Sequence, residues 1–179
     1  HGIGVAVDRK TRKPIFIPGS LVGELVEAKV VDQKNKFSRA KLTKVIEPSA
    51  QRLKPKCKHY WQCGGCDLQH LSIDEQLAFK REKVQSLFAR QGFKEPLPWQ
   101  DPLISEEYQY RRKARIGVQY NKLNQPIVGF RQLASNNLIP IKSCEVLAPE
   151  AMSVFTDIEL ILSKLSQKKS VGHVEVLVS

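Results

Sequence analysis

The 179-residue sequence lacks several features that would define its class at once. It has no apolar run long enough to cross a membrane and no segment typical of a secretory signal peptide. It has no internal repeat and no low-complexity tract, and its four cysteines fall short of the density of small disulfide-rich domains. These absences argue against a membrane-spanning or secreted protein and indicate a reducing, cytoplasmic compartment.

Acidic residues are scarce as well, with 18 Asp and Glu against 29 Lys and Arg, a net charge of +11. Such an excess points to a polyanionic partner. Eight of the basic side chains fall between positions 34 and 56, beside a single acid, Glu47. These eight are Lys34, Lys36, Arg39, Lys41, Lys44, Arg52, Lys54 and Lys56.

A second basic cluster reads YRRKAR and has Tyr108 and Tyr110 beside it. Cations suit phosphates and aromatic rings suit unstacked bases, so this combination favours RNA. A solvated basic face that only aids solubility is the alternative. A membrane surface is disfavoured because neither cluster lies on a convincing amphipathic helix. The candidate RNA-binding residues are Lys34, Lys36, Arg39, Lys41, Tyr110, Arg111, Arg112, Lys113, Arg115 and Arg131.

The cysteines are few but unevenly placed: Cys57, Cys63 and Cys66 lie within ten residues, and Cys144 is far downstream. A Cys-x5-Cys-x2-Cys run with one distant cysteine has the spacing of a four-thiolate metal centre. Gly64 and Gly65 would allow the tight turn between the last two ligands.

Four readings of these cysteines are open on spacing alone: an iron–sulfur cluster, zinc, two disulfides, or unligated buried thiols. Disulfides fit a reducing compartment poorly. Zinc ribbons usually bring two CxxC knuckles and this chain has one, although His59 and His70 could serve as further ligands.

Alternation of apolar and polar residues predicts a mainly β chain with an α+β second part. Strands are expected over 3–7, 14–17, 24–31 and 37–46, with a hairpin loop at 32–35. Short strands with tight turns favour a small antiparallel barrel of the oligonucleotide-binding kind. Such a barrel needs about five strands, and the sequence up to position 47 predicts about four. A first strand is therefore expected upstream of His1.

Ser72 and Glu75 form a capping box that predicts a helix reaching Gln91, where Gly92 stops it. Its apolar stripe should pack in a core. Strands are expected over 114–120, 127–130, 138–141 and 171–178, and a second helix from Pro149. The last strand is apolar and has no following turn, so a continuation beyond Ser179 is expected. The stripe of the first helix consists of Ile73, Leu77, Val84, Leu87 and Phe88.

The residues resemble one family in the order in which they occur. That order is IFIPGSLVGELVEAKV, CKHYWQCGGCDLQHLSIDEQLAFKREKV, YRRKARIGVQY, VGFRQLASNNLIPIKSCEVL and VGHVEVL. It resembles the bacterial 23S rRNA uracil-5-methyltransferases that carry an N-terminal TRAM domain. The related tRNA enzyme lacks both the TRAM barrel and the cysteine block, and a second rRNA paralogue lacks the barrel.

The resemblance implies a [4Fe-4S] cluster on Cys57, Cys63, Cys66 and Cys144. It implies a TRAM-type barrel over 1–47, a cluster loop over 48–70 and a central RNA-binding domain over 71–179. The implied partner is 23S ribosomal RNA, with neither DNA nor a membrane expected, and the chain is expected to be a monomer.

The family's catalytic domain binds S-adenosylmethionine and methylates uracil at C5. No glycine-rich loop here follows a strand and opens a helix, and no fifth cysteine remains as a nucleophile. Cys144 as a nucleophile would leave the cluster one ligand short, and His173 is read as a packed or satisfied strand residue. No catalytic residue is therefore assigned, and these 179 residues alone should not methylate RNA. A free-standing metal-stabilised RNA-binding module is the alternative function.

Overall fold

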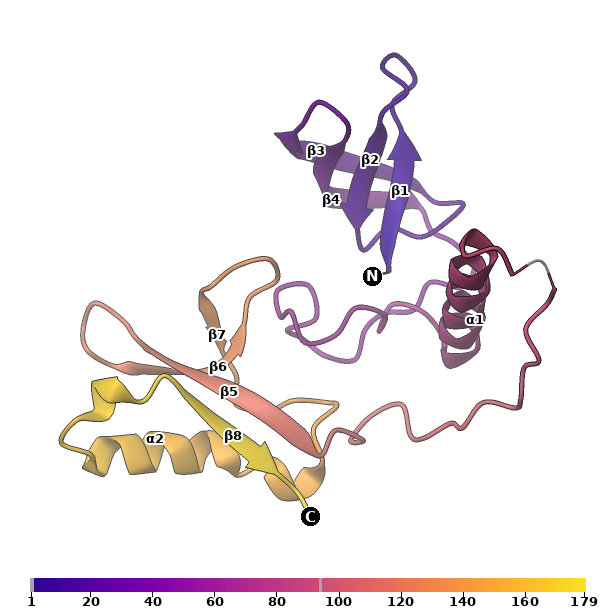
Figure 1. The fold of residues 1–179 in the computed structure, drawn as a ribbon. Coiled ribbons are helices and arrows are strands. Elements are labelled where there is room, and N and C mark those ends of the chain that lie inside the picture. The colour runs from indigo at the N-terminus through magenta and orange to yellow at the C-terminus, as the bar shows by residue number, and fades with distance from the viewer. Residues whose placement is uncertain (1, 94) are drawn as a thin grey trace. The chain divides into compact units, whose positions relative to one another are not determined.

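The computed structural model describes residues 2–93 and 95–179, which form two compact units (Figure 1). The first unit comprises His1–Pro55 and Asp67–Leu97, and the second comprises Lys56–Cys66 and Pro98–Ser179. All four cysteines therefore belong to the second unit. The domain boundaries expected from the sequence (1–47, 48–70 and 71–179) stay a prediction.

The first unit contains a four-stranded sheet of β1 (Ile3–Val7), β2 (Pro14–Pro18), β3 (Leu25–Gln33) and β4 (Ser38–Glu47). The four strands lie where the alternation predicted them. Their order is β1-β2-β4-β3, with β2 and β4 parallel and the other pairs antiparallel. The prediction of a purely antiparallel barrel is therefore wrong in part. Within the described residues the sheet is open, with β1 and β3 at its edges.

A buried ionic network ties this sheet to the chain that follows it. Glu24, whose side chain is 0% exposed, forms an ion pair with Arg52. The Arg52 Nη2 also donates to the Gly19 carbonyl at 2.6 Å, and the backbone N–H groups of Leu21 and Ser49 donate to the Glu24 carboxylate at 2.8 and 3.2 Å. Arg52 is therefore engaged internally, although the sequence placed it among the basic residues expected to meet a polyanion.

Helix α1 (Ile73–Arg90) begins and ends as the sequence predicts. The Ser72 hydroxyl accepts from the Glu75 backbone N–H, and Gly92 has a φ of +93°, which favours glycine. The predicted core packing of its apolar stripe is wrong. None of the eighteen residues of α1, all within the described ranges, is buried, and Leu87 is 47% exposed.

The second unit contains an antiparallel sheet of order β7-β6-β5-β8. Its strands are β5 (Lys113–Tyr120), β6 (Pro126–Arg131), β7 (Leu138–Pro140) and β8 (His173–Leu177). Each lies within or close to a predicted strand. Successive strand side chains point to opposite faces, and the inward residues Ala114, Ile116 and Val118 are buried while Lys113 and Arg115 are exposed.

Helix α2 (Val154–Lys164) covers the inward face of this sheet (Figure 1). Phe155, Ile158 and Leu162 enter the core, and Phe155 meets Phe130 edge to face with ring centroids 5.9 Å apart. The helix was expected to open at Pro149, but Pro149–Ala151 forms a short 3-10 turn and α2 starts five residues later. A second such turn, Lys168–Ser170, precedes β8.

The main apolar core of the described residues therefore lies in the second unit, between the sheet and α2. No described helix combines the length and the apolar character that crossing a membrane requires. Two four-stranded sheets and two α-helices make the described chain mainly β, as the sequence predicts.

Candidate functional site

Three of the four cysteines lie on the loop Lys56–Cys66, which is fixed to the end of β6. The Gly64 N–H donates to the Arg131 carbonyl at 3.0 Å, and the Leu133 N–H donates to the Gln62 carbonyl at 2.7 Å. These bonds flank a bridge between Cys63 and Gln132. Tyr60 anchors the loop, since it is only 6% exposed. These backbone hydrogen bonds therefore hold the cysteine loop alongside the residues that follow β6.

The fourth cysteine, Cys144, follows β7, and Arg111 joins its segment to the cysteine loop. The Arg111 N–H donates to the Val146 carbonyl at 2.8 Å, and the Arg111 carbonyl accepts from Ala148 at 2.9 Å. The Arg111 side chain reaches the loop, where Nη2 donates to the Gly65 carbonyl at 3.0 Å. Arg111, a predicted RNA-binding residue, is thus placed between the two cysteine segments and is half-buried.

The pKa of Cys63 responds to its burial and to the other three thiols. Burial raises the pKa of Cys63, a hydrogen bond from the Gly65 backbone lowers it, and the neighbouring Cys66, Cys144 and Cys57 raise it further. A thiolate at Cys63 is therefore disfavoured by its burial and by negative charge on any of the other three cysteines. The fold gathers all four predicted ligands into one region, each of them half-buried.

The four cysteines supply a donor set of four thiols. None of the four cysteines, all of them in the described ranges, is in a disulfide. Equally, no three His, Cys, Asp or Glu side chains in the described ranges are arranged around a position for one metal ion. Four thiolates are the donor set that iron–sulfur clusters use, so the residue types present would suit such a group.

The candidate RNA-binding residues of the first unit lie on the hairpin of β3 and β4. The Lys34 N–H donates to the Phe37 carbonyl at 2.9 Å and closes the predicted turn. Arg39 and Lys41 alternate with the buried Ala40 and are exposed. The Arg39 guanidinium lies 5.4 Å from the centre of the Phe37 ring. Lys36 is exposed, and Lys34 forms an exposed ion pair with Asp32 at 3.2 Å.

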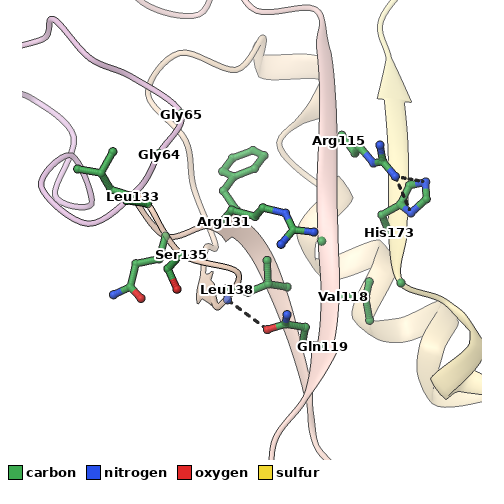
Figure 2. Close-up of a pocket in the computed structure, with 15 residues that line it drawn as sticks. Gly64, Gly65, Arg115, Val118, Gln119, Arg131, Leu133, Ser135, Leu138 and His173 are labelled. Carbon is green, nitrogen blue, oxygen red and sulfur yellow. Dashed lines mark hydrogen bonds between the residues drawn. The ribbon is translucent and has the colours of Figure 1, made fainter. Parts of the chain in front are cut away.

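The basic residues of the second unit do not form one cluster. Arg112 Nε donates to the Val178 carbonyl at 3.1 Å, and Lys113 pairs with Glu175 at 3.8 Å. Tyr110 is 47% exposed. Arg115 and Arg131, sixteen positions apart, both line one groove of about 700 Å³ in this unit (Figure 2).

Sequence reasoning missed two features. His173 lies beside Arg115 in the groove, because Gly117 on β5 faces His173 on β8. The Glu24–Arg52 pair joins residues 28 positions apart. Both depend on which distant segments become neighbours, and local periodicity carries no signal of that. The expectation that His173 is a satisfied strand residue is consistent with its contact to Arg115.

Comparisons with known proteins agree on the type of fold. The crystal structure of Pyrococcus abyssi tRNA (uracil-54, C5)-methyltransferase with S-adenosyl-L-homocysteine matches 98% of this chain and 42% of its own, with a TM-score of 0.58. At 22% identity this likeness shows a shared fold. No family model matches the chain.

Relatives found by sequence comparison have higher identity to this chain than that structure does. A 23S rRNA (uracil(1939)-C(5))-methyltransferase RlmD of Colwellia psychrerythraea is 45% identical over 186 residues, covering 99% of this chain and 39% of the relative. The protein of the same name in Shewanella sediminis is 42% identical, with 98% and 40% covered. That of Aliivibrio fischeri is 42% identical over 179 residues. The chain thus spans about two fifths of the length of the curated relatives it matches.

Proposed function

We propose that this chain, which is homologous over its whole length to the N-terminal portion of the RlmD methyltransferases, is the RNA-binding and cluster-binding part of such an enzyme. The whole protein would transfer a methyl group from S-adenosylmethionine to uracil C5 in 23S rRNA. The observation that carries the proposal is 45% identity across 99% of the chain. No residue of this chain is assigned to the methyl transfer.

The cluster would be held by Cys57, Cys63, Cys66 and Cys144. When bound, a [4Fe-4S] group would join the cysteine loop to the segment after β7 and add a cross-link to the second unit. Each thiol must lose its proton to bind iron. Because burial and the neighbouring thiols raise the pKa of Cys63, that loss is unfavourable unless iron compensates it.

Arg111 would help to hold the two cysteine segments in place through its hydrogen bonds. Its backbone holds the segment that follows Cys144, and its side chain holds Gly65 between Cys63 and Cys66. Among the candidate RNA-binding residues it is therefore the one whose substitution would disturb the cluster. Arg112, which is exposed, is the better probe of RNA contact.

RNA binding rests on the exposed cations of both units. The β3–β4 hairpin would contribute Lys34, Lys36, Arg39 and Lys41, which is the part of the chain to which we assign the TRAM-type role. Arg112, Lys113, Arg115 and Arg131 would contribute from the second unit. Cations of this kind contact phosphates, so they position the RNA without specifying its sequence.

The test of the RNA proposal is a salt titration of binding to 23S rRNA fragments. Wild type should lose affinity steeply as salt rises, because each neutralised phosphate releases counterions. Lys36→Glu with Lys41→Glu should weaken binding across many sequences. The matched control is Lys80→Glu with Lys83→Glu, on exposed positions of α1. A flat salt response in wild type would refute the proposal.

The test of the whole activity uses the complete open reading frame. Its product should raise 5-methyluridine in 23S rRNA that lacks the modification, when S-adenosylmethionine is supplied, as measured by mass spectrometry of digested RNA. The 179-residue chain should give no product. Methylation of another base, or of tRNA alone, would overturn the assignment.

A further inference from the structure

The groove in the second unit lies against the outward face of its sheet, the face that α2 does not cover. On β5 the buried Ile116 and Val118 face α2, so Arg115, Gly117 and Gln119 face outward. His173 joins the same face because it is the register partner of Gly117. Figure 2 shows Arg115, Gln119 and His173 along the strands, with Arg131 between them and the cysteine loop.

Two cations line this groove, and neither forms an ion pair among the described residues; Glu175, the register partner of Arg115 on β8, pairs with Lys113 at 3.8 Å instead. Arg115 Nη2 lies 3.1 Å from Nε2 and 3.2 Å from Nδ1 of His173. Arg131 Nη1 donates to the Asn136 carbonyl at 3.3 Å and to its Oδ1 at 3.1 Å. The Asn136 oxygens orient the Arg131 guanidinium, and one ring nitrogen of a neutral His173 can accept from Arg115, so both guanidinium groups keep N–H donors for a ligand. The described residues that line the groove include neither Asp nor Glu.

The walls of the groove leave room for a ligand. Gly64 and Gly65 of the cysteine loop form one wall, and Gly172 forms part of another. A methyl group added at Gly172 would meet no described atom within 4 Å, so the backbone there faces open space. The volume of about 700 Å³ lies in the range of sites that hold a small organic molecule.

We propose that this groove binds about one or two nucleotides of single-stranded RNA, with Arg115 and Arg131 holding the phosphates. The proposal rests on the RNA-binding function proposed above and assigns it a particular site. Two cations in a groove lined by neither Asp nor Glu favour an anionic ligand, and the volume of about 700 Å³ is that of a small molecule such as a nucleotide. A single strand can enter such a space because its backbone bends and its bases are not stacked in a helix.

The cysteine loop takes part in this site through Gly64 and Gly65. The hydrogen bond from Gly64 to the Arg131 carbonyl places the loop directly against one of the two phosphate-binding residues. Ordering the loop therefore also shapes the groove.

The experiment measures binding of a short labelled single-stranded RNA and of a hairpin duplex to the 179-residue chain by fluorescence anisotropy across a salt series. Gly172→Leu adds a bulky side chain at a residue that lines the groove and removes no charge. Arg115→Gln with Arg131→Gln removes two charges from it. The matched controls are Gln167→Leu and the pair Lys122→Gln with Lys142→Gln, all at exposed positions outside the groove.

We expect Gly172→Leu to weaken single-strand binding by about tenfold and the double arginine variant to weaken it at least as much. The slope of log affinity against log salt should fall by about 1.4 in the arginine variant, at about 0.7 for each of two phosphates. The control variants should bind within about twofold of wild type at high salt, and hairpin binding should be unaffected by Gly172→Leu.

The outcomes separate the two proposals. If wild type binds RNA with a steep salt slope but the groove variants bind like their controls, the groove is not the site and the RNA-binding function stands. If wild type binds neither RNA, both fail. If Gly172→Leu weakens the hairpin as much as the single strand, the assignment to single-stranded RNA is overturned.

Discussion

The two units are stabilised in different ways. The second unit has an apolar core between a four-stranded sheet and α2, in which Ile116 and Leu147 are 0% exposed. The first unit buries only Ile17 and Ala40 among its described hydrophobic residues, together with Ser20, Ser38 and His70. An ion pair occupies the interior of the first unit where the second has aliphatic and aromatic side chains.

The two helices repeat this contrast. Eleven-residue α2 buries Phe155, Ile158 and Leu162, whereas none of the eighteen residues of α1, all in the described part, is buried. Both helices have an apolar stripe. The stripe predicts an amphipathic helix, but it does not predict whether other described residues pack against the apolar face. Stability in the first unit should accordingly be sensitive to charge and pH, and in the second to side-chain volume.

The largest effect is expected for Arg52→Met, which leaves the Glu24 carboxylate buried without its partner. Such a loss costs about 3–5 kcal/mol. Hydrogen exchange of the β2–β4 amides should accelerate accordingly. Both tryptophans, Trp61 and Trp99, lie in the second unit, so the unfolding transition seen by their fluorescence should not move.

Two controls sharpen this prediction. Lys54→Met, at an exposed position nearby, should leave exchange unchanged. Glu24→Met combined with Arg52→Met should recover much of the loss, since replacing both partners leaves no buried charge. If the β2–β4 amides of Arg52→Met exchange as slowly as those of wild type, the ion pair does not stabilise the first unit.

A loss of similar or slightly smaller size is expected in the second unit for Ile116→Ala. Truncating a fully buried isoleucine costs about 2–5 kcal/mol, including the cavity it leaves. The urea midpoint followed by tryptophan fluorescence should fall, while exchange in β2–β4 stays as in wild type. Leu123→Ala, at a position that is 78% exposed, is the control. Equal shifts in both units would show that they unfold together.

Acid should destabilise the first unit before the second. Burial raises the pKa of Glu24, but hydrogen bonds from Arg52, Leu21 and Ser49 outweigh it and lower the pKa from 4.5 to about 2. Burial, with Arg52, lowers the pKa of His70 from 6.5 to about 4. In both cases the folded-state pKa lies below the unfolded-state pKa, so the unfolded chain binds the proton first as pH falls. The contribution of each group to the free energy of unfolding is therefore complete above the unfolded-state pKa and is lost as pH falls toward the folded-state pKa.

The His70 contribution should therefore decline from about pH 6.5 to 4, and the Glu24 contribution, of the order of 3 kcal/mol, from about pH 4.5 to 2. Urea unfolding monitored by hydrogen exchange across this range gives the measurement. His70→Gln should flatten the upper part of the profile and leave the lower part. A wild-type profile that is flat between pH 6.5 and 3 would contradict the prediction.

The smallest effect is expected on α1. Leu87→Gln, at a position 47% exposed, should change stability by no more than about 0.5 kcal/mol. The same change at Leu162 of α2, which is 2% exposed, should destabilise the second unit strongly. Circular dichroism during thermal unfolding compares the two variants. A loss above about 1 kcal/mol at Leu87 would mean that α1 packs in this chain.

The features predicted well from the sequence are those that local residues determine. Ser72 and Gly92 bound α1, and period-two alternation located the strands. The four cysteines share the second unit, while their role as metal ligands stays a prediction. The features that the sequence did not predict depend on which distant segments of the chain become neighbours in the fold. They are the parallel pairing of β2 with β4, the burial of Arg52 against Glu24, and the contact of Arg115 with His173.

The four-cysteine site is the central claim, and iron content tests it most directly. The chain purified without oxygen should contain about four irons and four sulfides and be brown, and Cys144→Ser should lose most of that iron. Ser143→Ala, beside it and exposed, is the control and should keep the full content. One zinc per chain in wild type, or full iron in Cys144→Ser, would contradict the account.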